Sequence, residues 1–307
     1  MLKKLYWFIL VALGFSTILP SLFYDFWFLD LFAHFRVQYI LVLLFLFLIS
    51  FHIKSKLFSK LFIVSLVIWN SIYILPLYFS NATISENTNE DLSILSVNLL
   101  SSNTNSAQVL ELIREKDHDI LVLMELTPHW ETELKSVFKS YPFYKVEPRH
   151  DNFGIALFSK IDMSSSIVYF ENSLKPSIKA ELSFGGKPLS ILASHPVPPI
   201  SSAYFDSRNS QLQDIARKRR GFSENFILIG DLNTSSFSSH FQELLSNADL
   251  VDSRNGFGIA STWPVGFYPL RTTLDHCLIG GDLQVLERYA GKNVGSDHLP
   301  IFIRVGI

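Results

Sequence analysis

The sequence predicts an α/β fold in which a layered sandwich of mixed β-sheets follows three transmembrane helices. Two observations support this. Residues 1–80 contain three long apolar spans, and residues 93–307 alternate strand-length apolar runs with amphipathic helical segments. Several strand-length runs follow one another with no helix between them. That order fits mixed sheets and argues against a doubly wound parallel sheet, in which a helix follows each strand.

The apolar spans are residues 5–23, 37–53 and 61–79. Each is close to the roughly 20 apolar residues that cross a bilayer core. One such span near the start would also fit a signal peptide, and three would also fit a buried helical bundle. Buried bundle helices have polar faces, and these spans have none, so transmembrane helices are the prediction. The spans contribute to the 48% hydrophobic share of the chain and its mean hydropathy of +0.26.

The charges beside the spans predict an orientation. Lysines stand before the first span and between the second and third (Lys3, Lys4, Lys54, Lys56 and Lys60), whereas the first connection holds Asp25, Asp30 and one cation, Arg36. Cationic loops stay in the cytoplasm. We therefore expect a multi-pass protein of the inner or plasma membrane, with a cytoplasmic N-terminus and an extracytoplasmic region from residue 81 onward.

The region after the spans is expected to be a polar linker (residues 81–92) and one globular domain (residues 93–307). Strands are expected at 93–100, 119–126, 154–160, 166–170, 177–184, 189–195, 226–230, 273–280 and 299–307, and helices at 106–116, 129–138, 207–219 and 240–248. The 106–116 helix, for example, places Val109, Leu110 and Ile113 on one face. Residues 282–290 are expected to form a strand or an irregular segment.

The charge of the globular part does not favour nucleic acid. Of the 26 Lys and Arg residues, six lie in residues 1–80, as do two of the 28 Asp and Glu residues, which leaves residues 81–307 with a net charge of −6. Domains that bind nucleic acid through its phosphates usually carry a basic excess. The basic run RKRR at 217–220 is interpreted as a solvated helix face.

The single cysteine, Cys277, excludes a disulfide within the chain. It lies in the apolar run LDHCLI, which predicts a buried and unreactive thiol.

Polar side chains interrupt the apolar runs where predicted strands end or begin. They are Asn98, Glu125, His195, Asp231, Asn233, Asp275, Asp297 and His298. Burying one polar group without a partner costs roughly 1–3 kcal/mol. One such interruption is ordinary, but this many at strand ends predicts that the ends converge on a shared site.

These residue types indicate chemistry on a phosphate ester. Carboxylate and carboxamide oxygens are ligands for Mg²⁺ or Mn²⁺, and cysteine ligands for a structural zinc are missing. A metal and histidine donors neutralise charge on phosphoryl oxygens while a carboxylate orients the attacking water. The sequence contains no GxSxG, Walker-type or GxGxxG pattern, so acyl transfer, nucleoside-triphosphate hydrolysis and dinucleotide binding lack support.

The set SVN, LMEL, SHP, GDLN, LDH and SDHLP, in this order, resembles the endonuclease/exonuclease/phosphatase superfamily. That superfamily includes deoxyribonuclease I, apurinic endonucleases, bacterial sphingomyelinases and inositol-phosphate 5-phosphatases. The resemblance covers residues 93–307, and GDLN followed by SDHLP is its most specific part. It implies a four-layered α/β sandwich of the deoxyribonuclease I type.

The resemblance also implies roles. Glu125 would bind the metal, Mg²⁺ or Mn²⁺, with Asn98 beside it and Asp297 as a second carboxylate on the metal side. Asp231 would orient or deprotonate the attacking water, and Asn233 would hold a phosphoryl oxygen. The remaining three residues would act on the phosphate: His298 contacts it, Asp275 fixes the ring of His298, and His195 donates to the phosphate or the leaving group.

Each of these signals has a simpler interpretation when taken alone. Asp231 and Asn233 fit a turn after a strand, Asp297 fits a cap or loop, His195 fits a loop histidine, and Glu125 fits the start of a helix. It is the combination in family order that favours a site.

The sequence also departs from the family pattern. Met124 stands where the family usually has Gln, and the Glu that orients the second histidine in the deoxyribonuclease-like branch is not found, although HDN at 150–152 lies near its expected place. His276 is expected to be structural, and Trp263 is expected to pack near the site.

The sequence therefore predicts a membrane-anchored, divalent-metal-dependent phosphodiester hydrolase. Its substrate is left open between nucleic acid and a phospholipid head group, and no protein partner is predicted. The loops 196–206 and 253–272, rich in Pro and aromatic residues, would insert at a lipid surface or stack a base. The alternative is a non-catalytic, membrane-anchored module that binds a phosphate ligand. Degenerate relatives should lose Glu125, Asp231 or His298, and all three are present here.

Overall fold

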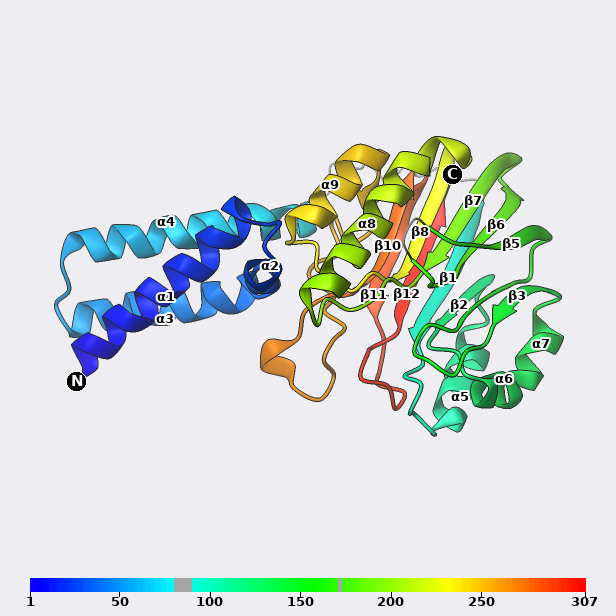
Figure 1. The fold of residues 1–307 in the computed structure, drawn as a ribbon, viewed down its shortest axis with the longest axis horizontal. Coiled ribbons are helices and arrows are strands. Elements are labelled where there is room, and N and C mark those ends of the chain that lie inside the picture. The colour runs from blue at the N-terminus through cyan, green and yellow to red at the C-terminus, as the bar shows by residue number, and fades with distance from the viewer. Residues whose placement is uncertain (80–89, 171–172) are drawn as a thin grey trace.

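The computed structural model of the protein describes residues 1–79, 90–170 and 173–307. It has two parts (Figure 1). Four α-helices and a short 3₁₀ turn form the helical unit, residues 1–79. The remaining helices and all strands form the sandwich domain, which begins with the strand β1. The helical unit projects from one end of the sandwich domain, and helix α2 lies at the junction (Figure 1).

The helical unit is apolar along most of its length. Its helices are α1 (Leu2–Leu22), α2 (Trp27–Ala33), α3 (Arg36–His52) and α4 (Leu57–Ile74), with a 3₁₀ turn at Leu75–Leu77. Two helices, Leu2–Leu22 and Leu57–Leu77, are long and apolar enough to cross a membrane. Helices α2 and α3 meet at 67° and make a third span only if the bent pair is counted as one. Residues 81–89 of the predicted linker (81–92) lie outside the described residues.

The sandwich domain contains two six-stranded sheets. The first has the order β11 (Gln284–Ala290), β12 (Ile301–Gly306), β1 (Asp91–Asn98), β2 (Ile120–Met124), β4 (Ile155–Ser159) and β3 (Phe143–Glu147). The second has the order β5 (Met163–Val168), β6 (Ser177–Phe184), β7 (Lys187–Ser194), β8 (Asn225–Asp231), β10 (Asp275–Gly280) and β9 (Val251–Asp252). Both sheets mix parallel and antiparallel pairs, as the sequence predicted.

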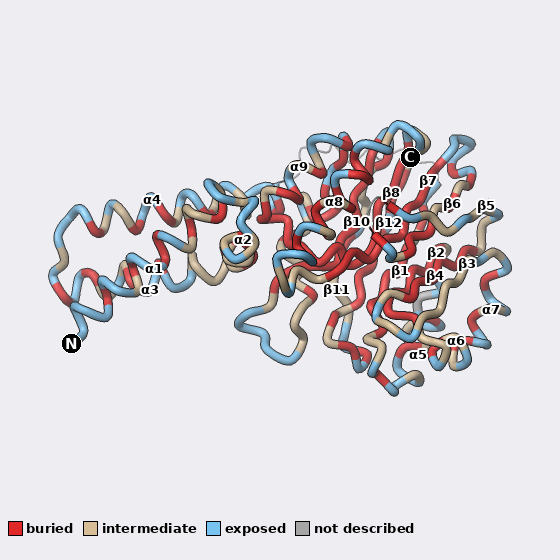
Figure 2. The backbone as a smooth tube through the Cα atoms, viewed as in Figure 1, coloured by how far each residue is buried: buried red, intermediate tan, exposed pale blue. Residues whose placement is uncertain are grey.

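Helices cover the outer face of each sheet and complete four layers. Helices α5 (Ser106–Lys116), α6 (Pro128–Glu133) and α7 (Val137–Ser140) pack on the first sheet, and α8 (Ser202–Lys218) and α9 (Ser239–Ala248) pack on the second. One apolar cluster fills the space between the sheets, and one lies under each helical layer. The buried chain is therefore concentrated in the strands, while the helical unit exposes much of its surface (Figure 2). The predicted four-layered sandwich is confirmed.

Strand directions explain why polar residues from distant parts of the chain meet. β1 runs parallel to β2, and β7 runs parallel to β8, so these strands end at a common edge. β10 and β12 run antiparallel to β8 and β1, so they begin at that edge. Asp275, the first residue of β10, is accordingly paired in register with Asp231, the last residue of β8.

Some elements differ from the prediction for local reasons. The predicted 129–138 helix is broken into α6, a 3₁₀ turn and α7. Strand β3 was not predicted; it is a half-buried edge strand without a clear apolar alternation. Helix α8 begins at Ser202, inside the predicted 196–206 loop, because the Ser201 hydroxyl caps it by accepting from the amide of Tyr204. Residues 282–290 contain a regular strand, β11, and β1 begins two residues before the predicted start of the domain.

The helical unit is fixed to the sandwich domain by a buried ion pair. The Asp30 carboxylate on α2 lies 3.1 Å from the Arg208 guanidinium on α8, and both side chains are fully buried. The Ser238 hydroxyl donates to the other Asp30 oxygen at 2.6 Å. A buried pair broken on one side costs roughly 3–5 kcal/mol, so α2 is held firmly in place.

Hydrogen bonds around α2 and at the end of the helical unit reinforce this contact. The Trp27 indole donates to the carbonyl of Pro199 at 2.6 Å, and the Thr272 hydroxyl donates to the carbonyl of His34 at 3.1 Å. At the other attachment, the Leu77 carbonyl accepts from the amides of residues 256 and 258. The helical unit therefore contacts the sandwich domain at two places, around α2 and at Leu77.

Candidate active site

The first part of the site is a carboxylate held by neutral donors. Glu125 follows β2 directly; its carboxylate accepts from the Asn98 amide at 3.2 Å and from the backbone amide of Ser101 at 2.8 Å. The residue is buried and has a positive φ of 59°, an unfavourable backbone state for glutamate. Asn98 also donates to Asp231 at 3.2 Å and accepts from the amide of Leu100, so it orients the two carboxylates.

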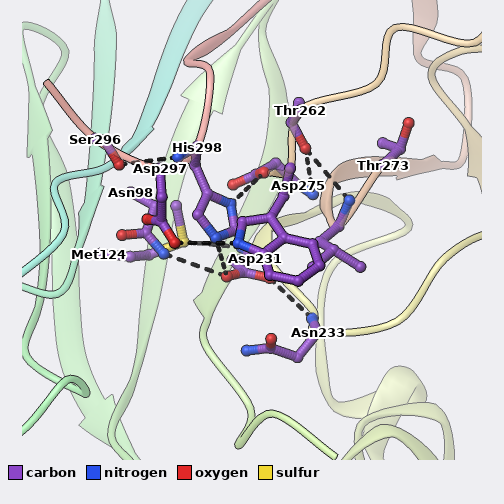
Figure 3. A network of polar contacts seen from close by, with 12 residues as sticks. Asn98, Met124, Asp231, Asn233, Thr262, Thr273, Asp275, Ser296, Asp297 and His298 are labelled. Carbon is purple, nitrogen blue, oxygen red and sulfur yellow. Dashed lines mark hydrogen bonds and ion pairs between the residues drawn. The ribbon is translucent and has the colours of Figure 1, made fainter. Parts of the chain in front are cut away.

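Asp231 lies at the centre of the network (Figure 3). One oxygen lies 3.5 Å from Nε2 of His195 and 3.6 Å from Nε2 of His298. The other accepts from the amide of Asn233 at 2.9 Å. Burial raises the pKa of Asp231, but the two histidines and the amide outweigh burial and lower the pKa to about 2. Asp231 is therefore a carboxylate at neutral pH.

His298 forms an Asp–His pair with Asp275. Nδ1 of the ring lies 2.8 Å from the Asp275 carboxylate, which leaves Nε2 directed at Asp231 (Figure 3). Burial lowers the pKa of His298, yet the carboxylates of Asp275 and Asp231 raise it further, to about 10. The ring can therefore donate a proton from Nε2 toward the space above Asp231.

His195 is the second histidine at Asp231, and no carboxylate of the described residues bonds its Nδ1. Among the described residues its Nδ1 has no hydrogen-bond partner, although the atom is buried. The ring instead packs against Phe153, with 5.4 Å between ring centroids. The segment HDN at 150–152 does lie nearby, since Asn152 lines the same cavity, but it supplies no acid to His195 among the residues described.

Asn233 is placed by the turn after β8. Its φ is 50°, a state that asparagine tolerates, and its side-chain amide donates to the carbonyl of Pro196 at 2.9 Å. Its own carbonyl accepts from Arg208 at 2.9 Å, so the guanidinium that pairs with Asp30 also supports this turn.

Asp297 precedes His298 and lines the same cavity. One carboxylate oxygen accepts from the Trp263 indole at 3.0 Å. The other is buried, and none of the described residues donates a hydrogen bond to it. Trp263 also packs on His298, with 6.3 Å between ring centroids, which confirms that it lies beside the site.

The donor set fits a hard divalent cation. Glu125 and Asp297 are carboxylates at the cavity with only neutral hydrogen-bond donors as partners, and no described Lys or Arg forms an ion pair with either. A buried carboxylate oxygen without a partner, as in Asp297, is costly unless a cation or water satisfies it. Oxygen ligands of this kind suit Mg²⁺ or Mn²⁺.

A second group of ligand-type atoms lies close by. Atoms of Asp231, Asp275 and His298 come within 4.8 Å of one another. Nδ1 of His298 already bonds the Asp275 carboxylate at 2.8 Å. A cation bound there through Nδ1 would have to break that bond, whereas the partners of Glu125 and Asp297 are only neutral donors; these two carboxylates are therefore the alternative candidate ligands, with Asn98 beside Glu125.

The site residues form one end of a cavity of about 440 Å³. Six of the eight predicted residues line it: Glu125, His195, Asp231, Asn233, Asp297 and His298. Asn98 and Asp275 lie behind them and contact Asp231 and His298. The structure therefore brings all eight predicted residues together.

Two contributors were not recognised in the sequence. Met124, noted there only as a departure from Gln, accepts a hydrogen bond through its sulfur from the Asp231 amide at 2.8 Å (Figure 3). Arg208 was predicted only as a residue of the helix at 207–219. Its complete burial next to a buried Asp from residues 1–80 is a tertiary property, and no local pattern indicates it.

Comparison with known families identifies the chain. The model of the endonuclease/exonuclease/phosphatase family matches residues 95–298. The chain belongs to this family. Comparison with curated protein sequences gives no match.

Solved structures share the fold at low sequence identity. TDP2 of D. rerio, solved with a single-strand DNA product, is 19% identical, with a TM-score of 0.59 over 71% of this chain and 100% of that one. A family protein of Leptotrichia buccalis is 17% identical (TM-score 0.57; 70% and 100% covered). Sphingomyelinase C of Streptomyces griseocarneus is 16% identical (TM-score 0.51; 70% and 99% covered). In each case about 30% of the chain lies outside the match.

Proposed function

We propose that the protein is a membrane-anchored, divalent-metal-dependent phosphodiester hydrolase. The observation that supports this most directly is the Asp231 carboxylate facing His195 and His298 at one end of a cavity that Glu125 and Asp297 also line. Family membership supports hydrolysis, and the similar structures include TDP2 in complex with a single-strand DNA product and a sphingomyelinase C. The helical unit would anchor the enzyme, with the sandwich domain extracytoplasmic.

The residues at the cavity have different roles in hydrolysis. Asp231 accepts a hydrogen bond from the attacking water and orients it toward phosphorus. His298, held by Asp275, donates from Nε2 to a phosphoryl oxygen, and His195 donates to the phosphate or the leaving oxygen. Asn233 completes the phosphate contacts. A divalent cation held by Glu125 and Asp297 would neutralise charge on the phosphoryl oxygens.

The substrate class of the proposal is a phosphodiester, either nucleic acid or a phospholipid head group. The competing function is a binding module that holds a phosphate ligand without hydrolysing it. The structure contains the complete set of predicted catalytic side chains, whereas a binding module has no need for an Asp–His pair beside a second carboxylate. We therefore favour the enzyme.

The test uses the full chain in detergent with bis-p-nitrophenyl phosphate. Turnover is expected with Mg²⁺ or Mn²⁺, none with chelator, and Asp231→Asn should reduce kcat by roughly 10²–10⁴-fold. Asp282→Asn is the matched control, because the Asp282 side chain is 61% accessible and, among the described residues, forms an ion pair with Lys187 alone. A folded protein without turnover in any divalent metal would support the binding module.

The metal assignment has its own test. Glu125→Gln is expected to raise the Kd for Mn²⁺ by at least about tenfold in a calorimetric titration, because it removes a charged ligand. Asp275→Asn should change the Kd less. The reverse order would place the cation among Asp231, Asp275 and His298 instead.

A further inference from the structure

The cavity has a polar end and an apolar wall, and the wall is built by two different parts of the chain. The residues of the apolar wall are Leu31 and Phe35 of the helical unit with Phe153, Pro198, Pro199, Ile200 and Leu274 of the sandwich domain, and His34 lines the cavity beside them. The polar end is the site described above. A phosphodiester bound there would have the apolar wall, including the α2–α3 corner, beside it.

The contribution of the helical unit is fixed in place. Asp30, one residue before Leu31, forms the buried ion pair with Arg208. The His34 carbonyl accepts from Thr272, and Trp27 donates to the Pro199 carbonyl, so both sides of the wall are tied together by direct hydrogen bonds. An anchor alone would not need these contacts beside the catalytic residues.

The wall lacks the groups that a nucleic acid needs. None of the described residues that line the cavity is a lysine or an arginine. Proteins that track a nucleic-acid backbone use a positively charged groove, and each neutralised phosphate contributes to affinity. A strand passing through this cavity would place its neighbouring phosphates against proline, leucine and phenylalanine.

The surroundings of the cavity are apolar as well. Ile200 is 71% exposed at its rim. Phe267 and Tyr268 are also largely exposed, on a loop that ends at Arg271, whose carbonyl accepts from Gln38 of α3. Exposed apolar groups beside helices that are long and apolar enough to cross a membrane fit a bilayer surface.

We propose that the apolar wall is a subsite for the hydrocarbon part of a lipid phosphodiester, and that the helical unit is therefore part of the substrate site. The proposal rests on the hydrolase function proposed above. The phosphate binds at Asp231, His195 and His298, and the hydrocarbon lies against Leu31, Phe35 and Ile200. Water adds to phosphorus, one P–O ester bond breaks, and the leaving oxygen takes a proton; the products are a phosphomonoester and an alcohol.

The test compares two phosphodiesters that differ only in chain length. Full-length protein in mixed micelles is given hexadecyl 4-nitrophenyl phosphate or ethyl 4-nitrophenyl phosphate with Mn²⁺. The expected ratio of kcat/KM, hexadecyl over ethyl, is at least about tenfold in favour of the long chain. Leu31→Ser should lower that ratio by roughly tenfold, because it removes apolar contact with the hydrocarbon.

A matched control separates the subsite from partition into the micelle. Leu29 lies on the same helix as Leu31, is also half-buried, and does not line the cavity. Leu29→Ser should leave the ratio at its wild-type value. A ratio near one in the wild type, or an equal effect of both substitutions, would overturn the proposal, as would faster cleavage of a single-stranded oligonucleotide than of the hexadecyl probe.

A binding measurement keeps the proposal testable if turnover fails. The Asp231→Asn chain should bind hexadecyl phosphate in the same micelles, and adding Leu31→Ser should weaken the binding by roughly tenfold while Leu29→Ser does not. Absence of turnover with this binding retained would overturn the hydrolase and keep the lipid subsite. Turnover of the ethyl probe without selective binding of the hexadecyl compound would do the opposite.

Discussion

Individual residues in the site are held in states that folding alone would not select. Glu125 has a positive φ, Asp297 has a buried oxygen without a described partner, and two histidines surround one buried carboxylate. Such states each cost roughly 1–3 kcal/mol and are found where function requires them. In the His298–Asp275 pair, Nδ1 of the ring bonds Asp275, so only Nε2 is free to contact a substrate.

Asp275→Asn tests whether Asp275 positions the ring of His298. The carboxamide keeps the size of the side chain but removes the charge that favours the protonated ring and its orientation. We expect kcat for bis-p-nitrophenyl phosphate to fall by roughly 10²–10⁴-fold with little change in KM. Steady-state kinetics and a thermal melt check this. A kcat within about threefold of wild type, in a protein with an unchanged Tm, would show that Asp275 does not position His298.

At the residue scale, the sequence predicted which polar side chains lie together, but not all the contacts that hold them in place. The eight site residues follow or precede apolar strands, which marks each of them in the sequence, and β-sheet pairing brings them together. The sequence already showed no match for the Glu that orients the second histidine. The sulfur contact of Met124 with the Asp231 amide could not be foreseen, because it depends on which residues meet across the two sheets.

The strands bring the site residues together, and β8 packs closely against β7 at Gly230, directly before Asp231. Gly230 precedes Asp231 with a φ of +145°, and a Cβ on it would lie 2.1 Å from the backbone oxygen of Ser194 in β7. Only glycine allows β7 and β8 to approach at this point. The glycine of GDLN thus sets the position of the aspartate that follows it.

Gly230→Ala is therefore expected to separate β7 from β8 at their carboxyl ends. We expect a loss of roughly 2–4 kcal/mol in the free energy of unfolding and a large drop in kcat, because Asp231 moves relative to His195. Gly221→Ala is the control, since a Cβ there would meet no atom within 4 Å. Equal stability of the two variants in a denaturant titration would contradict the packing argument.

The short helix α2 is the element that the sequence did not reveal. Hydropathy indicates three spans, and the second of them does correspond to α3, but the seven residues of α2 before it belong to the contact with the sandwich domain. In the sequence, Asp25 and Asp30 of this connection indicated only the membrane orientation. Asp30 turns out to be fully buried against Arg208, a partner 178 residues away.

Asp30→Ala should reveal how much this contact stabilises. It leaves the buried guanidinium of Arg208 without its partner, so we expect a loss of roughly 3–5 kcal/mol and a fall in Tm of roughly 10 °C. Asp25→Ala is the matched control, because the Asp25 side chain is 80% exposed. Melting of the full chain in detergent checks both. If the Tm of Asp30→Ala equals that of the wild type, the ion pair does not hold the helical unit in place.

The whole molecule combines a sandwich domain of the endonuclease/exonuclease/phosphatase family with a helical unit that lies outside residues 95–298, the part that the family model matches. The layered fold followed from the strand pattern, and the family followed from the motifs. What could not follow from either is the arrangement of the two parts, because the contacts that fix it join α2 to α8 and to the 253–272 loop. The predicted topology places the sandwich domain outside the cytoplasm.

Cysteine labelling tests that topology with little background, because Cys277 is the only cysteine and is buried. Lys292→Cys places an exposed thiol on the sandwich domain, and Lys56→Cys places one in the connection between α3 and α4. In intact cells a membrane-impermeant maleimide should label the first and spare the second until the cells are lysed. The opposite pattern would reverse the predicted orientation.

The ion pair between α2 and α8 has a consequence for biosynthesis. A ribosome adds roughly 5–20 residues per second, so Asp30 emerges about 10–35 s before Arg208. Throughout that interval Asp30 does not have Arg208 to pair with, so the early helices are made before the partner of this buried acid exists. The pair forms only once the later part of the chain has arrived and α8 has folded. A chain cut short before residue 208 would keep that acid unpaired, so α2 could not take up the docked position that it has in the finished protein.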